Sequence, residues 1–133
     1  SRRRAAPRAG GRCGLPDDGR AIRILTPFGF FSIVRKPEHA AAGLPTVRAR
    51  VAADLDALRR EALPDPGPTE AHTGTDYPFR ARAPQAAVAR AIGALVAGID
   101  YANFKDAVAA RQGPARAEVY HGVWSALRRL ENR

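Results

Sequence analysis

The sequence predicts an α+β fold, in which a four-stranded, largely antiparallel sheet carries helices packed on one face. Short stretches early in the chain place apolar residues at every second position, and longer stretches later place them at helical spacing. The chain has 133 residues, of which 45% are hydrophobic and 26% are charged, a composition typical of a globular protein. We therefore expect a single α+β domain over residues 22–133, preceded by an arm of residues 1–21.

Four stretches predict the strands of the sheet. The first two flank a Pro-Phe-Gly turn and are expected to pair as a hairpin. The last two alternate apolar and charged side chains, which is the pattern of a strand with one buried face. The expected strands are Ile22–Thr26, Phe30–Lys36, Thr46–Val51 and Asp76–Pro84.

Alternation in the last two strands places arginines together on one face. The apolar side chains are expected to point toward the helices, namely Val47, Ala49, Val51, Tyr77, Phe79, Ala81 and Ala83. The opposite, open face would then be lined by Arg48, Arg50, Arg80 and Arg82, with Arg35 adjoining.

Four further stretches have apolar residues at helical spacing and predict helices. The first begins near Val51 and ends at Leu63-Pro64, because proline stops a helix, and the loop Asp65–Gly74 follows. The other three begin near Gln85, at Tyr101 and at Pro114. Proline is a residue type that suits the first turn of a helix. The stripes expected to point inward include Val88, Ile92, Leu95, Val96 and Ile99, and later Val119, Val123, Leu127 and Leu130.

Five short motifs follow one another in these predicted elements. They are FFSIV-x-K at Phe30–Lys36, VRAR at Val47–Arg50, an Asp-Tyr pair with an Arg-bearing strand at Asp76–Arg82, DY-x-NFK at Asp100–Lys105, and Tyr-x-x-Val-Trp at Tyr120–Trp124. In this order they resemble a family of small, uncharacterised proteins of bacteria and their phages. The resemblance covers about residues 22–130 and implies the domain boundaries, but it implies no activity, cofactor or substrate.

The formal charge is +9, and more than half of it lies near the start of the chain. Residues 1–23 hold seven arginines against Asp17 and Asp18, which gives +5 there and leaves +4 for the rest. Such an excess favours encounters with polyanions and serves solubility equally well. Because residues 1–21 are rich in Arg, Gly and Pro and lack a hydrophobic period, we expect a disordered arm, with nucleic-acid binding as the alternative.

The single cysteine, Cys13, excludes an internal disulfide and a CxxC redox or zinc site. A reducing, cytoplasmic location is therefore predicted. No apolar run reaches the roughly 18 residues that span a bilayer, and the start lacks the apolar centre of a secretory signal. We expect no membrane partner.

No catalytic or cofactor motif occurs in the sequence. HxH, HExxH and GxSxG are absent, and His39, His72 and His121 share no spacing typical of metal ligands, so we expect no metal and no cofactor. The densest polar cluster is Asp100, Asn103 and Lys105, which with His121 could bind a phosphate or carboxylate. Asp100 or Asn103 could equally cap the following helix.

The arginine-bearing sheet face is the stronger candidate site. Arg48, Arg50, Arg80 and Arg82 could contact phosphates while Phe31 stacks on a base, as on the sheet of the common RNA-binding domains. They could instead pair with carboxylates or cover the sheet with their aliphatic stems, or dock a partner protein or a second copy. The sequence favours a non-enzymatic binding domain that uses this face. The alternative is a small enzyme acting on a phosphorylated or nucleic-acid substrate around Asp100, Asn103 and Lys105.

Overall fold

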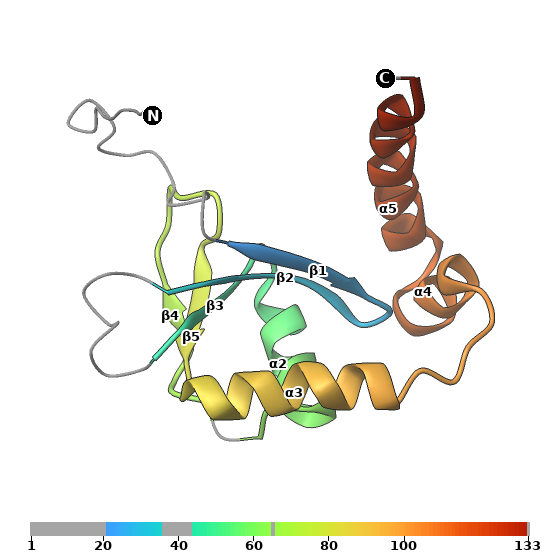
Figure 1. Cartoon of the computed structure of the whole chain (residues 1–133). Coiled ribbons are helices and arrows are strands. Elements are labelled where there is room, and N and C mark those ends of the chain that lie inside the picture. Colours follow the sequence, from blue (N-terminus) through green and yellow to red (C-terminus); the bar gives the residue numbers. More distant parts are fainter. Residues whose placement is uncertain (1–20, 36–43, 65, 133) are drawn as a thin grey trace, which may run out of the picture.

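The computed structural model describes residues 21–35, 44–64 and 66–132 (Figure 1). Residues 1–20 of the predicted arm 1–21, with Cys13, and the segment that holds His39 lie outside the described residues. The strands are β1 Ile22–Thr26, β2 Gly29–Val34, β3 Thr46–Ala49, β4 Glu70–Ala71 and β5 Phe79–Arg82. They form an antiparallel sheet in the order β1-β2-β3-β5-β4. The helices are α2 Ala52–Glu61, α3 Gln85–Ala97, α4 Phe104–Gln112 and α5 Pro114–Leu127, continued by the 3-10 turn η3 Arg128–Asn132.

The predicted α+β class is confirmed, but the described part of the sheet has five strands, not four. The additional strand, β4, lies in the segment predicted as a loop and pairs with β5 through Glu70 opposite Arg80 and Ala71 opposite Phe79. Two residues are too short to display a period of two, so the pattern could not reveal this strand.

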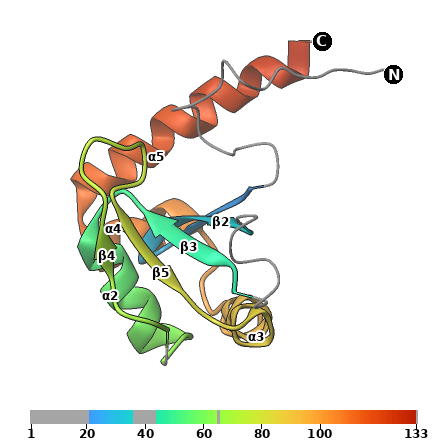
Figure 2. The same ribbon diagram turned by 90° about the vertical axis from the view of Figure 1, so that its left-hand side faces the viewer.

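The hydrophobic core lies between the sheet and helices α2 and α3, which lie on the same side of it (Figures 1 and 2). Strand alternation and register place Phe31, Val47, Ala49 and Ala81 on this face. The helices contribute Leu55 and Leu58 from α2 and Val88 and Ala91 from α3. Packing of these two helices follows the predicted helical spacing.

Helices α4 and α5 form a separate pair at the end of the β1–β2 hairpin (Figure 1). Phe104 of α4 packs against Tyr120 and Trp124 of α5, with ring centroids 6.0 Å and 5.7 Å away. The prediction that the whole apolar stripe of the last helix points inward is wrong, since Val119, Leu127 and Leu130 are more than half exposed. The physical reason is that α5 extends away from the sheet and packs mainly on α4.

The end of α3 also differs from the prediction. Val96 and Ile99 are more than half exposed, because the helix packs on the core only through its first three turns. In the described ranges no helix is both long and apolar enough to cross a membrane.

Candidate functional site

The register of the sheet gathers arginines on the face opposite the core. Arg48 of β3 lies between Ser32 of β2 and Arg80 of β5, and Arg82 lies opposite Thr46. Arg80 in turn lies opposite Glu70 of β4. We call Arg48, Arg80 and Arg82, together with Arg23 and Arg50 at the margins, the arginine face.

Tyr77 contacts four of these five arginines. Its ring centroid lies 4.4 Å from the guanidinium carbon of Arg48 and 4.6 Å from that of Arg50. Its hydroxyl accepts a hydrogen bond from Nε of Arg23 at 3.2 Å, and its carbonyl accepts one from Nε of Arg80 at 3.0 Å. Cation–π contacts of this kind strengthen where the ring is removed from water, and Tyr77 is only 3% exposed.

The position of Tyr77 corrects the sequence prediction, which placed it on the core face beside Phe79. Strand β5 begins at Phe79, and Pro78 separates Tyr77 from it. The alternation that holds within β5 therefore does not extend back to Tyr77, and its ring turns to the arginines. The sequence pattern predicted the arginines of this face, but it did not predict that Tyr77 contacts them.

The arginine face is polar and in part buried, so it differs from the open face that was predicted. Arg48 is 2% exposed and donates from Nη2 to the Ser32 hydroxyl at 2.7 Å. Arg82 forms an ion pair of 2.7 Å with Glu70, and Arg50 donates to the carbonyl of Asp76 at 3.0 Å. Burial lowers the pKa of Arg80, nearby Arg48 lowers it further, and Glu70 opposes the shift.

The stacking role predicted for Phe31 is wrong. Phe31 pairs with Ile24 of β1 on the core face and is 1% exposed, so its ring is not available to a ligand on the arginine face. Arg35 follows the end of β2 and lines an apolar groove beside α3. It therefore does not adjoin the other predicted arginines.

The residues of the alternative pocket lie around α4. Asn103 caps this helix, since its Oδ1 accepts a hydrogen bond from the Asp106 N–H at 3.0 Å. Asp100, Lys105 and His121 are exposed, and the cavities described below are lined by other residues. Within the described ranges, no group of three His, Cys, Asp or Glu side chains is placed to hold a metal ion.

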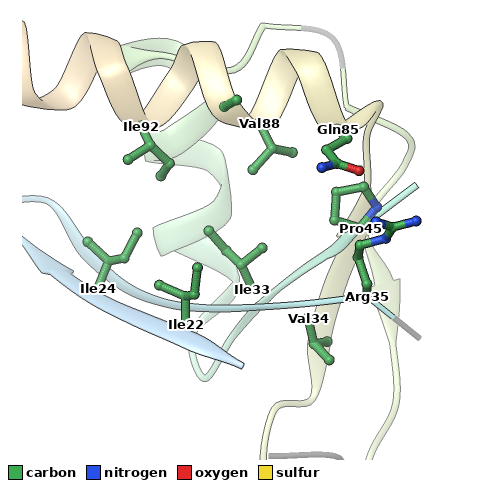
Figure 3. A pocket seen from close by; sticks show the side chains of 10 residues that line it. Ile22, Ile24, Ile33, Val34, Arg35, Pro45, Gln85, Val88 and Ile92 are labelled. Atoms are coloured by element: carbon green, nitrogen blue, oxygen red, sulfur yellow. The ribbon is translucent and has the colours of Figure 1, made fainter. Parts of the chain in front are cut away.

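The apolar groove beside α3 has a volume of about 790 Å³ and was not predicted. Figure 3 shows Ile22, Ile24 and Ile33 of the β1–β2 hairpin pointing toward Val88 and Ile92 of α3. At one end of the groove lie Pro45, Arg35 and Gln85, while Val34 points to the other side of the strand.

A smaller cavity of about 220 Å³ lies where α2 meets the α4–α5 pair. It holds a buried carboxylate: Asp54 is 3% exposed and accepts from both terminal nitrogens of Arg116, at 3.0 Å and 3.1 Å. Asp54 also accepts from the Phe30 N–H at 3.0 Å. Gly29 permits this approach, because a Cβ there would lie 3.0 Å from the carboxyl carbon of Asp54.

The charges around this cavity shift two pKa values. Burial alone would lower the pKa of Arg116, but its hydrogen bonds to Asp54 and Tyr120 outweigh that effect and raise it. Burial raises the pKa of Tyr120, while Arg116 acts against the shift. Asp54 and Arg116 are 62 residues apart, so no local pattern in the sequence could have joined them.

Comparison with known proteins does not assign this chain to a group: no family model, no curated protein and no solved structure matches it. A function for the chain therefore has to follow from its own side chains.

Proposed function

We propose that the protein is a non-enzymatic binding domain of the cytoplasm whose arginine face binds single-stranded nucleic acid through its phosphates. The observation that carries this is the grouping of four arginines on Tyr77, with Arg82 beside them. Five guanidinium groups lie together on this face, where Arg82 forms an ion pair with Glu70 and Arg50 donates to the backbone carbonyl of Asp76. A cluster of positive charge of this kind attracts a polyanion.

The chemistry supports contacts to phosphates in place of stacking on bases. Two guanidinium groups occupy the ring of Tyr77, and Phe30 packs against the same ring with centroids 6.2 Å apart. Phe31 lies in the core. With no free ring on this face in the described part of the chain, binding would depend on the backbone and carry little sequence preference.

The more accessible arginines would make the contacts. Arg50 is exposed, and the side chain of Arg82 is 38% exposed, whereas Arg48 is buried and supports its neighbours. Contacts to Tyr77 and Asp76 already restrict Arg50, so less side-chain entropy is lost when it binds a phosphate.

The test is the salt dependence of binding to a fluorescently labelled single-stranded RNA or DNA, measured by anisotropy. Each lost phosphate contact lowers the slope of log K against log salt by about 0.7 for a single strand. The double variant Arg50→Gln, Arg82→Gln should therefore lower the slope by about 1.4. The matched control, Arg90→Gln with Arg128→Gln, removes the same charge from exposed positions on α3 and η3.

The control should leave the slope close to that of the unaltered chain. An equal change in both double variants would mean that net charge alone is responsible, and the proposal would fail. Absence of nucleic-acid binding, together with binding of the arginine face to a partner protein or a second copy, would also overturn it.

We further propose that the chain belongs to the small bacterial and phage family that its motifs resemble. The proposal rests on the motifs, several of whose residues have structural roles in this chain. Asn103 of DY-x-NFK caps α4, and Tyr120 and Trp124 of Tyr-x-x-Val-Trp pack against Phe104. Tyr77 of the Asp-Tyr pair contacts the arginines of VRAR.

A further inference from the structure

The small cavity between α2 and the α4–α5 pair is separate from the arginine face and is lined by three other arginines. Arg60 comes from α2, Arg111 from α4 and Arg116 from α5. The remaining wall is formed by Phe28, Ala53, Ala57, Asp54 and Gln112. Three arginines from three helices therefore line one space of about 220 Å³.

Two of these arginines are held in place by carboxylates. Asp54 binds Arg116 through two parallel hydrogen bonds, and its Oδ2 accepts a third hydrogen bond from the Phe30 N–H. This fork-to-fork geometry fixes the orientation of the guanidinium plane. Arg111 forms an ion pair with Glu61 and lies over the ring of Phe28, 5.6 Å from its centroid.

Arg60 is the arginine of this cavity that forms no ion pair with a carboxylate of the described residues. It is exposed, and no hydrogen bond or ion pair joins it to another residue in the described part of the chain. Three guanidinium groups against Asp54 and Glu61 leave one uncompensated positive charge at the cavity. Because the oxygens of Asp54 already accept three hydrogen bonds, this carboxylate serves to orient Arg116.

We infer that this cavity binds a phosphate group, either as the free anion or as a monoester on a small molecule. Guanidinium groups that converge from different helices suit a tetrahedral oxyanion, which can accept hydrogen bonds in several directions. The volume is below the 300–1,000 Å³ that is usual for larger ligands, so the phosphate and little else would be enclosed.

Binding there would also fasten the α4–α5 pair to the rest of the molecule. Three polar contacts now join them: Arg116 with Asp54, Arg111 with Glu61, and the Gln112 side chain donating to the Pro27 carbonyl at 3.0 Å. A phosphate that contacts Arg60 on α2 and Arg111 or Arg116 on the other side would add a bridge between the two parts. Stabilisation by a ligand follows because the ligand binds only the folded state.

The experiment is a titration of the full chain with inorganic phosphate at constant ionic strength, by calorimetry and by thermal unfolding. The unaltered chain and the matched control Arg90→Gln should show saturable binding and a rise in Tm. Arg60→Gln should bind at least tenfold more weakly, and since Arg60 has no partner within the described residues, its Tm without phosphate should stay unchanged. The side-chain amide of Gln112 should shift in NMR spectra during the titration.

Two further arms separate the sources of the phosphate and the two sites. A small phosphomonoester, such as glycerol phosphate, that competes with inorganic phosphate, while glycerol does not, would identify an esterified ligand; absence of competition would identify the free anion. Arg50→Gln with Arg82→Gln should leave phosphate binding unchanged, so failure of the arginine face would not affect this result. Absence of saturable binding, or equal weakening in Arg60→Gln and Arg90→Gln, would overturn the inference.

Discussion

Both faces of the sheet hold fully buried side chains, but different chemistry stabilises them there. On the helix side, Phe31 and Val47 are each 1% exposed within an apolar core. On the other side, Ser32 and Arg48 are 0% and 2% exposed, and they pair with each other through a hydrogen bond. Burial of a polar side chain is costly unless its hydrogen bonds are made, so the second face depends on specific partners.

The core face therefore contributes mainly to stability and, on the proposed function, the arginine face contributes mainly to ligand binding. Apolar packing tolerates few changes of volume but takes no part in attracting a charged ligand. The arginine face carries the charge that would attract such a ligand. Tyr77 and hydrogen bonds hold its guanidinium groups in place, so loss of these contacts would move the positive charges. Substitutions on the core face should therefore change mainly the free energy of unfolding, and substitutions on the arginine face should change nucleic-acid binding.

The largest expected effect is on the core face. Phe31→Ala should lower the free energy of unfolding by about 3–5 kcal/mol, because it removes a buried aromatic side chain and leaves a cavity. Chemical denaturation measures this loss. The folded fraction should bind single-stranded nucleic acid with unchanged salt dependence, and a loss of less than about 1 kcal/mol would contradict the assigned burial.

A smaller effect on stability and a larger one on binding are expected at Tyr77. Tyr77→Leu removes two cation–π contacts and one hydrogen bond, which should cost about 2 kcal/mol and weaken nucleic-acid binding severalfold as Arg48 and Arg50 lose their common support. Tyr77→Phe keeps the ring and should cost about 0.5–1 kcal/mol. Denaturation and anisotropy measure the two quantities. Equal weakening of binding by Leu and Phe would show that the hydroxyl, not the ring, organises the face.

The parts of this fold that sequence reasoning could predict are those governed by local periodicity. Alternation in Thr46–Ala49 and Phe79–Arg82 placed Arg48, Arg80 and Arg82 on one face, and the register of the sheet has them there. The start of α3 at Gln85 follows from the proline before it. Each of these features depends on neighbours within a few residues.

The features that were missed depend on partners far along the chain. Tyr77 reaches Arg23, which is 54 residues away, and Asp54 reaches Arg116 at a separation of 62 residues. The stripe of α5 has a regular period, but the period says only that one face is apolar, not what covers it. Its exposure follows from the direction that α5 takes after Gly113, where φ is +93°.

The smallest expected effect lies at the open edge of the core face. Ile22 points into the groove but is 63% exposed, so Ile22→Ser should change the free energy of unfolding by less than about 0.5 kcal/mol, far less than Phe31→Ala on the same face. It should also reduce the fluorescence of a hydrophobic dye bound to the protein, because the groove loses part of its apolar wall. Val119→Ser, on an equally exposed position of α5 outside the groove, is the matched control and should affect the dye less. A cost near 2 kcal/mol at Ile22 would mean that the groove is filled in solution and that this edge of the core face is closed.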